Sequence, residues 1–172
     1  WGADGAIVHG NEFIDTVATD IWFYFSYADG VVITENTFSG TTSPEYNIYG
    51  QSTTTTDLTI SDNVFMNGLE PIYLRGTQGW EITDNTIYGD GDSSHAGIYV
   101  RDGFGTIDGN TLIDADGGIL VDGVRYNYEA NITNNDISTS AGRTAPSAVG
   151  IWVEDCGTSP VNTGGNTIQV ME

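Results

Sequence analysis

Apolar and polar residues follow a short repeating phrase along this chain. In each copy an Asn is preceded three residues earlier by an aliphatic residue and followed two residues later by an apolar one. The copies are Val8/Asn11/Phe13, Ile33/Asn36/Phe38, Ile60/Asn63/Phe65, Ile82/Asn85/Ile87, Ile107/Asn110/Leu112, Ile132/Asn135/Ile137 and Thr163/Asn166/Ile168. The last copy carries Thr in place of the aliphatic residue. A recurrence roughly every 25 residues indicates a solenoid, in which each repeat is one turn.

A second phrase lies between successive copies, and its apolar and other residues alternate over four or five positions. Its central residues are Ile21, Ile48, Ile72, Ile98, Ile119 and Ile151. Such alternation is typical of a β-strand. Each repeat therefore predicts one strand around this Ile, a second strand that ends at the Asn, and a short third strand after it.

Three short strands per repeat predict an all-β fold, a parallel β-helix of about seven rungs. The central Ile residues and the aliphatic and aromatic residues of the Asn phrase are expected to point inward and form its core. A sandwich of hairpins would need two-residue Asp-Gly turns between paired strands, and the Asp-Gly pairs here do not alternate with the strands. We expect residues 1–172 to form a single domain, either by itself or as a module of a longer chain.

The recurring Asn residues are predicted to be structural. Asn tolerates the left-handed backbone conformation, so we expect it to turn a corner of the coil. Its amide can also donate to, and accept from, the equivalent Asn of the neighbouring rung. A hydrogen-bonded ladder is predicted for Asn36, Asn63, Asn85, Asn110 and Asn135.

The charge balance restricts the partners of this protein. The chain has 24 acidic residues against 4 basic ones, and all four are Arg. Nucleic acid is not an expected partner, because phosphate binding depends on clustered Lys and Arg. No apolar run reaches the length of about 18 residues that a membrane span requires. The acidity is typical of adaptation to a saline or calcium-rich exterior.

The repeats over residues 6–168 resemble the right-handed parallel β-helix repeat family, which is similar to pectate lyases, mannuronan epimerases and copper-enzyme accessory proteins. The resemblance implies an extracellular, cell-surface or periplasmic protein that acts on acidic polysaccharide, with the substrate along the sheet of the first strands. The epimerase-like run Tyr-Gly-Phe-Asp-Pro-His is absent, and no Lys is present for the role that Lys takes in some pectin-degrading relatives.

Two outward files of side chains are predicted on the strands of the second phrase, because neighbours of an inward Ile point outward. The first file contains Trp22, Tyr49, Tyr73, Tyr99, Leu120 and Trp152, and the second contains Tyr24, Gln51, Arg75, Arg101, Asp122 and Glu154. Aromatic rings stack on sugar rings, and Arg binds carboxylates. A uronic-acid polysaccharide is therefore expected across Tyr73, Arg75, Tyr99 and Arg101. Stacked aromatic rows also stabilise sheets by cross-strand packing, so packing or assembly is the alternative.

Lyase or epimerase chemistry would require a group that neutralises the sugar carboxylate, a base and an acid. Arg75 or Arg101 is the candidate neutraliser. The candidates for proton transfer are Tyr73, Tyr99 and His95, with Asp102 or Asp122 as an assisting or cation-binding group.

Four acidic residues are predicted to share one corner of two adjacent rungs and to bind calcium, which prefers carboxylate and carbonyl oxygen ligands. They are Asp90, Asp92, Asp114 and Asp116. The alternative is a pair of solvated turns, in which Asp and Gly are common. Zinc or copper is less well supported, because His9, His95 and Cys156 belong to different rungs.

The two ends of the predicted coil lack an amphipathic capping helix. Uncapped strand edges favour association. End-to-end self-association is therefore the second functional hypothesis, as in a filament, a surface layer or an adhesin.

Overall fold

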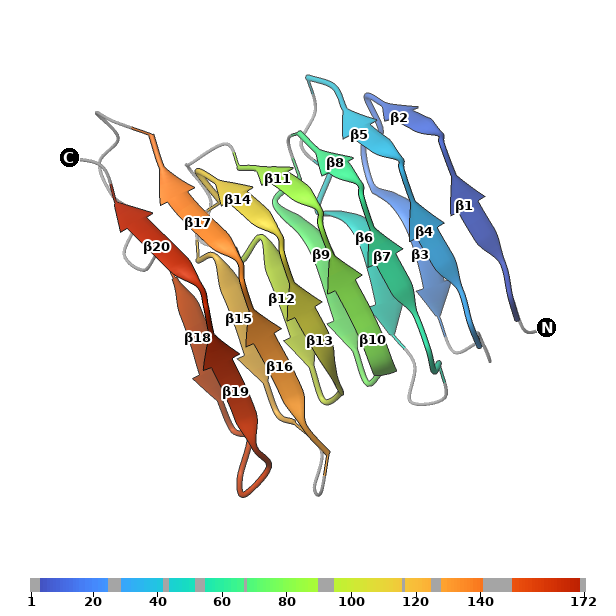
Figure 1. The fold of residues 1–172 in the computed structure, drawn as a ribbon. Coiled ribbons are helices and arrows are strands. Elements are labelled where there is room, and N and C mark those ends of the chain that lie inside the picture. Colours follow the sequence, from blue (N-terminus) through green and yellow to red (C-terminus); the bar gives the residue numbers. More distant parts are fainter. Residues whose placement is uncertain are drawn as a thin grey trace.

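The computed structural model describes residues 4–24, 29–41, 44–51, 55–66, 68–89, 95–115, 117–124, 128–140 and 150–170. Over these residues the chain coils into a parallel β-helix, as predicted (Figure 1). Each turn of the coil places its strands in three sheets, and the first and last strands lie at opposite ends of the stack.

Every strand pairs in parallel with its equivalent in the next rung. Among the described residues, sheet 1 consists of β1 (Ile7–His9), β4 (Val32–Thr34), β7 (Thr59–Ser61), β10 (Gln78–Thr83), β13 (Phe104–Asp108), β16 (Ala130–Thr133) and β19 (Val161–Gly164). Sheet 2 consists of β2 (Glu12–Ile14), β5 (Thr37–Ser39), β8 (Val64–Phe65), β11 (Thr86–Tyr88), β14 (Thr111–Ile113), β17 (Asp136–Thr139) and β20 (Thr167–Val170). Sheet 3 consists of β3 (Thr19–Tyr24), β6 (Tyr46–Gln51), β9 (Glu70–Arg75), β12 (Ile98–Arg101), β15 (Ile119–Asp122) and β18 (Ile151–Glu154).

The core follows the predicted inward files through the middle rungs. The central Ile residues of β6, β9, β12 and β15 pair in register, and so do those that precede the Asn residues in β4, β7, β10, β13 and β16. Phe13, Phe38 and Phe65 form a stack with ring centroids 4.8 and 4.7 Å apart. Trp80 is also buried, which the pattern did not predict. In the last described rung, Val153 and Ile168 are 37% and 49% exposed, so the expectation that they are enclosed is wrong for this chain.

The Asn ladder is confirmed, and it extends beyond the five predicted members to Asn11 and Asn166. In the middle of the ladder, the backbone N–H and the side-chain Nδ2 of Asn85 both donate to Asn110 Oδ1 at 3.0 Å. Asn85 Oδ1 in turn accepts from the backbone N–H and Nδ2 of Asn63, both at 3.0 Å. Its Nδ2 also donates to the carbonyl oxygen of Ile60 at 2.9 Å. Each amide between the two ends of the ladder therefore ties three rungs together.

The expected reason for these Asn residues is wrong in one respect, because they do not adopt the left-handed conformation. The residue directly before each ladder Asn has a positive φ instead, and these residues are Gly10, Glu35, Asp62, Asp84, Gly109, Asn134 and Gly165. The preceding residue makes the turn, which leaves the Asn side chain free to point inward and bond along the stack.

Five of the left-handed Asp and Asn residues at the corners are matched by Gly in the next rung. A Cβ atom added to this Gly would come within 2.4–3.0 Å of the side-chain oxygen of the left-handed residue in the preceding rung. Among the described residues the pairs are Asp15 and Gly40, Asp57 and Gly79, Asp84 and Gly109, Asp102 and Gly123, and Asn134 and Gly165. Because Gly has no Cβ atom, it leaves space for the carboxylate or amide oxygen of the left-handed residue at the neighbouring corner.

Within the described ranges, no helix is long and apolar enough to cross a lipid bilayer.

Candidate functional site

The residues of sheet 3 position the two predicted outward files. Tyr49, Tyr73, Tyr99 and Leu120 pair in register across β6, β9, β12 and β15, with Trp22 and Trp152 at either end of this aromatic file. The charged file runs beside it, from Gln51 through Arg75, Arg101 and Asp122 to Glu154. The predicted arrangement of these side chains is therefore present, whereas their role in binding stays a prediction.

The rings of the aromatic file are not equally available to a ligand. Tyr49 and Tyr73 stack with centroids 5.3 Å apart and planes at 11°, so each covers a face of the other. Trp22 meets Tyr49 edge-on, with planes at 83°, and Tyr99 meets Tyr73 at 89°. Trp22 and Trp152 are 66% and 54% exposed. The two ends of the file therefore offer more ring surface than its half-buried tyrosines do.

Tyr46 is a member of this aromatic cluster that the sequence pattern did not predict. Its ring lies 4.9 Å from that of Tyr49 and 5.3 Å from that of Tyr73. Strict alternation would place Tyr46 on the same side as Ile48, but Asn47 and Ile48 are both buried. This break in the alternation turns Tyr46 outward, and no simple sequence signal indicates it.

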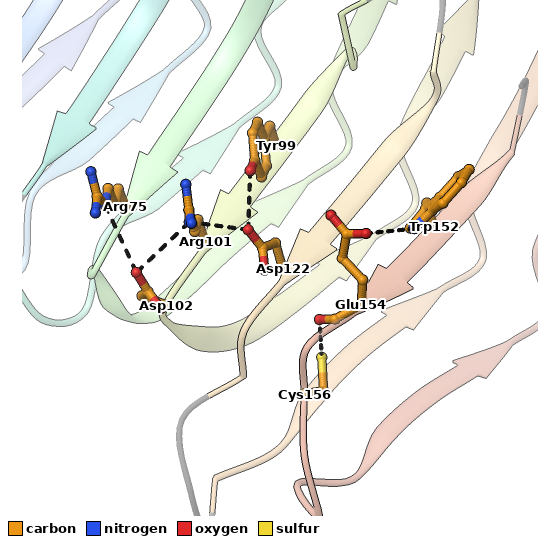
Figure 2. A network of polar contacts seen from close by, with 8 residues as sticks. All are labelled: Arg75, Tyr99, Arg101, Asp102, Asp122, Trp152, Glu154 and Cys156. Carbon is orange, nitrogen blue, oxygen red and sulfur yellow. Dashed lines mark hydrogen bonds and ion pairs between the residues drawn. The ribbon is translucent and has the colours of Figure 1, made fainter. Parts of the chain in front are cut away.

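Four charged side chains form a chain of ion pairs along the charged file (Figure 2). Arg75 Nε lies 3.8 Å from Asp102 Oδ2, and Arg101 Nε lies 3.9 Å from the same oxygen. Arg101 Nε is closer to Asp122 Oδ2, at 3.0 Å. Asp102 lies at a corner with φ of 55°, directly after the strand that carries Arg101. That corner places its carboxylate between the two guanidinium groups.

Hydrogen bonds also link the two files. Tyr99 Oη donates to Asp122 Oδ2 at 3.2 Å, and Tyr49 Oη donates to Gln51 Oε1 at 2.5 Å. Trp152 Nε1 donates to Glu154 Oε2 at 3.1 Å. The polar ends of these aromatic residues are thereby held toward the charged file.

The same surroundings determine how the tyrosines titrate. Burial, with the Asp122 charge and the hydrogen bond to it, raises the pKa of Tyr99 to about 12. Burial also raises the pKa of Tyr73, while Arg75 and Arg101 oppose this shift. Both hydroxyl groups are therefore protonated near neutral pH, and that of Tyr99 acts as a hydrogen-bond donor to Asp122.

The predicted catalytic residues are only partly brought together. Tyr99 and Arg101 both contact Asp122, but His95 lies at the other edge of sheet 3, with Nδ1 3.9 Å from Glu70 Oε1. Glu70 and Arg75 are the first and last residues of β9, so about 16 Å of extended strand separates the two edges. The predicted proton transfer by His95 to a sugar at Arg101 therefore has no support from this arrangement.

The predicted calcium corner lies mostly outside the described residues, which include Asp114 but not Asp90, Asp92 or Asp116. Asp114 accepts hydrogen bonds from the backbone N–H and the Oγ of Ser140, both at 2.6 Å. Each carboxylate oxygen of Asp114 therefore has a protein partner, and calcium binding stays a prediction.

The coiled arrangement of three parallel sheets around an Asn ladder defines a right-handed parallel β-helix protein. The chain matches the family model described as periplasmic copper-binding protein (NosD), over residues 1–103 and again over 42–170, and it belongs to that family. No curated protein and no solved structure matches the chain.

The family description raises the question of copper, and the described side chains do not fit such a site. No three His, Cys, Asp or Glu side chains in the described ranges are grouped so that they could hold a metal ion. The candidate soft ligands belong to three different sheets: His9 ends β1, Met66 directly follows β8, and Cys156 lies just beyond β18. Cys156 Sγ donates to the carbonyl oxygen of Glu154 at 3.1 Å. The soft ligands that copper prefers are therefore dispersed among the described residues.

Proposed function

We propose that the chain is an extracellular or periplasmic β-helix protein that binds a carboxylate-bearing polysaccharide along sheet 3. The observation that carries the proposal is the aromatic file beside a file that contains two Arg residues. The aromatic file is in register from Trp22 to Tyr99, and Leu120 interrupts it before Trp152. The periplasmic location given in the family description supports the proposed location.

The geometry favours binding over catalysis. A lyase or epimerase removes a proton from the carbon next to a sugar carboxylate, which requires a base beside the neutralising group. On this face Asp122 is paired with Arg101 at 3.0 Å, and Tyr99 is held as a protonated donor. Lyase or epimerase activity stays a prediction, and ultraviolet absorbance of an unsaturated uronate after incubation with polyuronate would reveal a lyase.

A glycan array with the wild type and the Arg75→Ala, Arg101→Ala double variant tests the proposal. We expect the wild type to bind acidic glycans and the double variant to lose that binding. Trp22→Ala should weaken binding about fivefold, because aromatic contacts contribute about 1 kcal/mol each beyond their area. Tyr128→Ala is the matched control, since its exposed ring packs on Phe104, away from sheet 3. Absence of glycan binding by the wild type would refute the proposal.

Self-association of the 172-residue chain is a second proposal, supported by the direction of the Asn ladder. Every ladder amide donates toward the following rung, so Asn11 presents an acceptor at one end of the described stack and Asn166 presents donors at the other. Two copies would therefore join head to tail, an arrangement that produces open filaments. Sedimentation velocity over a wide concentration range, with and without calcium, tests this, and a monomer throughout would contradict it.

A further inference from the structure

The charges on sheet 3 limit how many anions the face accepts. Arg75 and Arg101 carry two positive charges, and Asp102 and Asp122 carry two negative charges within 3.0–3.9 Å of them (Figure 2). Glu154 pairs in register with Asp122 in the next rung and adds another negative charge. The face is therefore not positively charged overall, and it belongs to a protein with a formal net charge of −20.

The two Arg residues differ in how strongly they are already paired. Asp122 Oδ2 lies 3.0 Å from Arg101 Nε, and the Asp122 side chain is only 11% exposed, although the Arg101 side chain is itself 42% exposed. Arg75 has a longer contact, at 3.8 Å, with an Asp102 side chain that is 51% exposed. Its neighbour on the other side is the uncharged Gln51. Arg75 is therefore the more weakly paired of the two Arg residues, and its guanidinium group is the better candidate for binding a ligand carboxylate.

Beyond Arg101 the charged file turns acidic. Asp122 and Glu154 follow Arg101 in the next two rungs, at the rung spacing of about 4.8 Å. A polymer with a carboxylate on every sugar would place like charges against these two residues when it lies along the rod. Juxtaposed like charges disfavour a partner strongly.

We infer that the ligand is a sparsely carboxylated polysaccharide, in which one carboxylate binds at Arg75 and the neighbouring sugars are neutral. This inference rests on the proposed function and narrows its substrate class. Neutral sugars suit the remainder of the aromatic file, where Trp22 and Trp152 are exposed. A homopolymer of uronic acids does not suit the segment of the face from Asp122 to Glu154.

Three oligosaccharides of equal length test the inference by isothermal titration calorimetry: one neutral, one with a single internal uronate, and one made entirely of uronates. We expect the singly charged ligand to bind about tenfold more tightly than the homopolymer at low salt, which corresponds to about 1.4 kcal/mol. High salt should narrow this difference, because it screens repulsion. Arg75→Gln should reduce the affinity for the singly charged ligand to that of the neutral one.

Removing the acidic end of the file gives the complementary test. The Asp122→Asn, Glu154→Gln double variant keeps hydrogen-bonding groups at both positions and should bind the homopolymer at least fivefold more tightly than the wild type. The control is Glu81→Gln, Asp136→Asn, which removes the same two charges from exposed positions of sheets 1 and 2. This control variant should leave the preference for the singly charged oligosaccharide over the homopolymer unchanged.

The outcomes separate the inference from the proposed function. Tightest binding of the homopolymer by the wild type at low salt would overturn the inference and leave polysaccharide binding in place. An equal gain in homopolymer affinity in the control variant would also overturn the inference. The net charge of the protein, rather than the charged file, would then determine which oligosaccharide binds more tightly. Failure of all three ligands to bind would refute the proposed function together with the inference.

Discussion

At the scale of single residues, the corners of this coil depend on which side chains tolerate a positive φ. Asp, Asn and Gly supply almost all the left-handed residues, and Glu35 is the exception among the described residues. The left-handed region is energetically unfavourable for non-Gly residues, and less so for Asp and Asn because their short side chains form local hydrogen bonds. Pairing a left-handed Asp with a Gly in the next rung avoids a contact between its carboxylate and a Cβ atom.

The pairing of Asp84 with Gly109 gives a prediction that separates conformational strain from the contact. Gly109→Ala should destabilise the protein by about 1–2 kcal/mol through its positive φ, and further because the new Cβ would lie 2.6 Å from Asp84 Oδ1. Gly10→Ala is the matched control, with φ of 65° and no atom within 4 Å of the added Cβ. Urea unfolding should show the larger loss for Gly109→Ala.

A double-mutant cycle completes this test. Asp84→Gly should recover part of the stability that Gly109→Ala loses, since neighbouring substitutions that share a contact are not additive. Strictly additive losses would contradict a direct contact between the two corners.

The raised pKa of Tyr99 predicts a loss of stability at alkaline pH. A Tyr that titrates near 10 in the unfolded chain and at about 12 in the fold favours folding in its protonated form. That contribution is complete below pH 10 and is lost as the pH rises from 10 to 12. Tyr99→Phe should therefore lose less stability than the wild type between pH 9 and pH 11, measured by urea unfolding. The same loss of stability in the wild type and in Tyr99→Phe would contradict the contribution of Tyr99 to the pH dependence.

At the scale of strands and ladders, the repeated phrase was sufficient to predict the three sheets, the ladder and the two outward files. Period-two alternation and the recurring Asn determine these features, and both are local in the sequence. Tyr46 was missed because two successive buried residues interrupt the alternation in β6. The exact sharing of Asp102 between two Arg residues was missed because it depends on a corner conformation and on distances across rungs. His95 was placed too near the Arg residues because a loop residue has no fixed register.

The ladder itself gives a prediction at this scale. Asn85→Ala removes an amide that bonds to both neighbouring rungs, and it leaves buried donors and acceptors without partners. Each such group costs about 1–3 kcal/mol, so we expect a loss of about 3 kcal/mol or more in the free energy of unfolding. Asn162→Ala, an exposed Asn of β19, is the control and should cost less than about 1 kcal/mol. Equal losses of unfolding free energy in the two variants would show that the buried ladder stabilises the protein no more than an exposed Asn does.

At the scale of the whole molecule, the net charge of −20 acts against the compact state. The carboxylates repel one another across the rod, and only four Arg residues oppose them. Salt screens such repulsion, with a Debye length of about 10 Å at 0.1 M.

We therefore expect the thermal unfolding midpoint to rise when sodium chloride is increased from about 10 mM to about 0.5 M. Differential scanning calorimetry would measure the shift, which we expect to be several degrees. A lower midpoint at high salt would indicate that attractive ion pairs, such as those of Arg75 and Arg101, outweigh the repulsion.

The hydrogen bonds between rungs run parallel to the long axis of the rod, and each rung is bonded only to the rungs on either side. Tension applied along that axis acts on every interface at once, and an outermost rung of the described stack, which is bonded on one side only, should separate first. The coil should come apart by peeling, one turn after another, each turn releasing a similar length of slack chain. A rod of this kind yields stepwise to pulling from its ends while it resists bending across its faces.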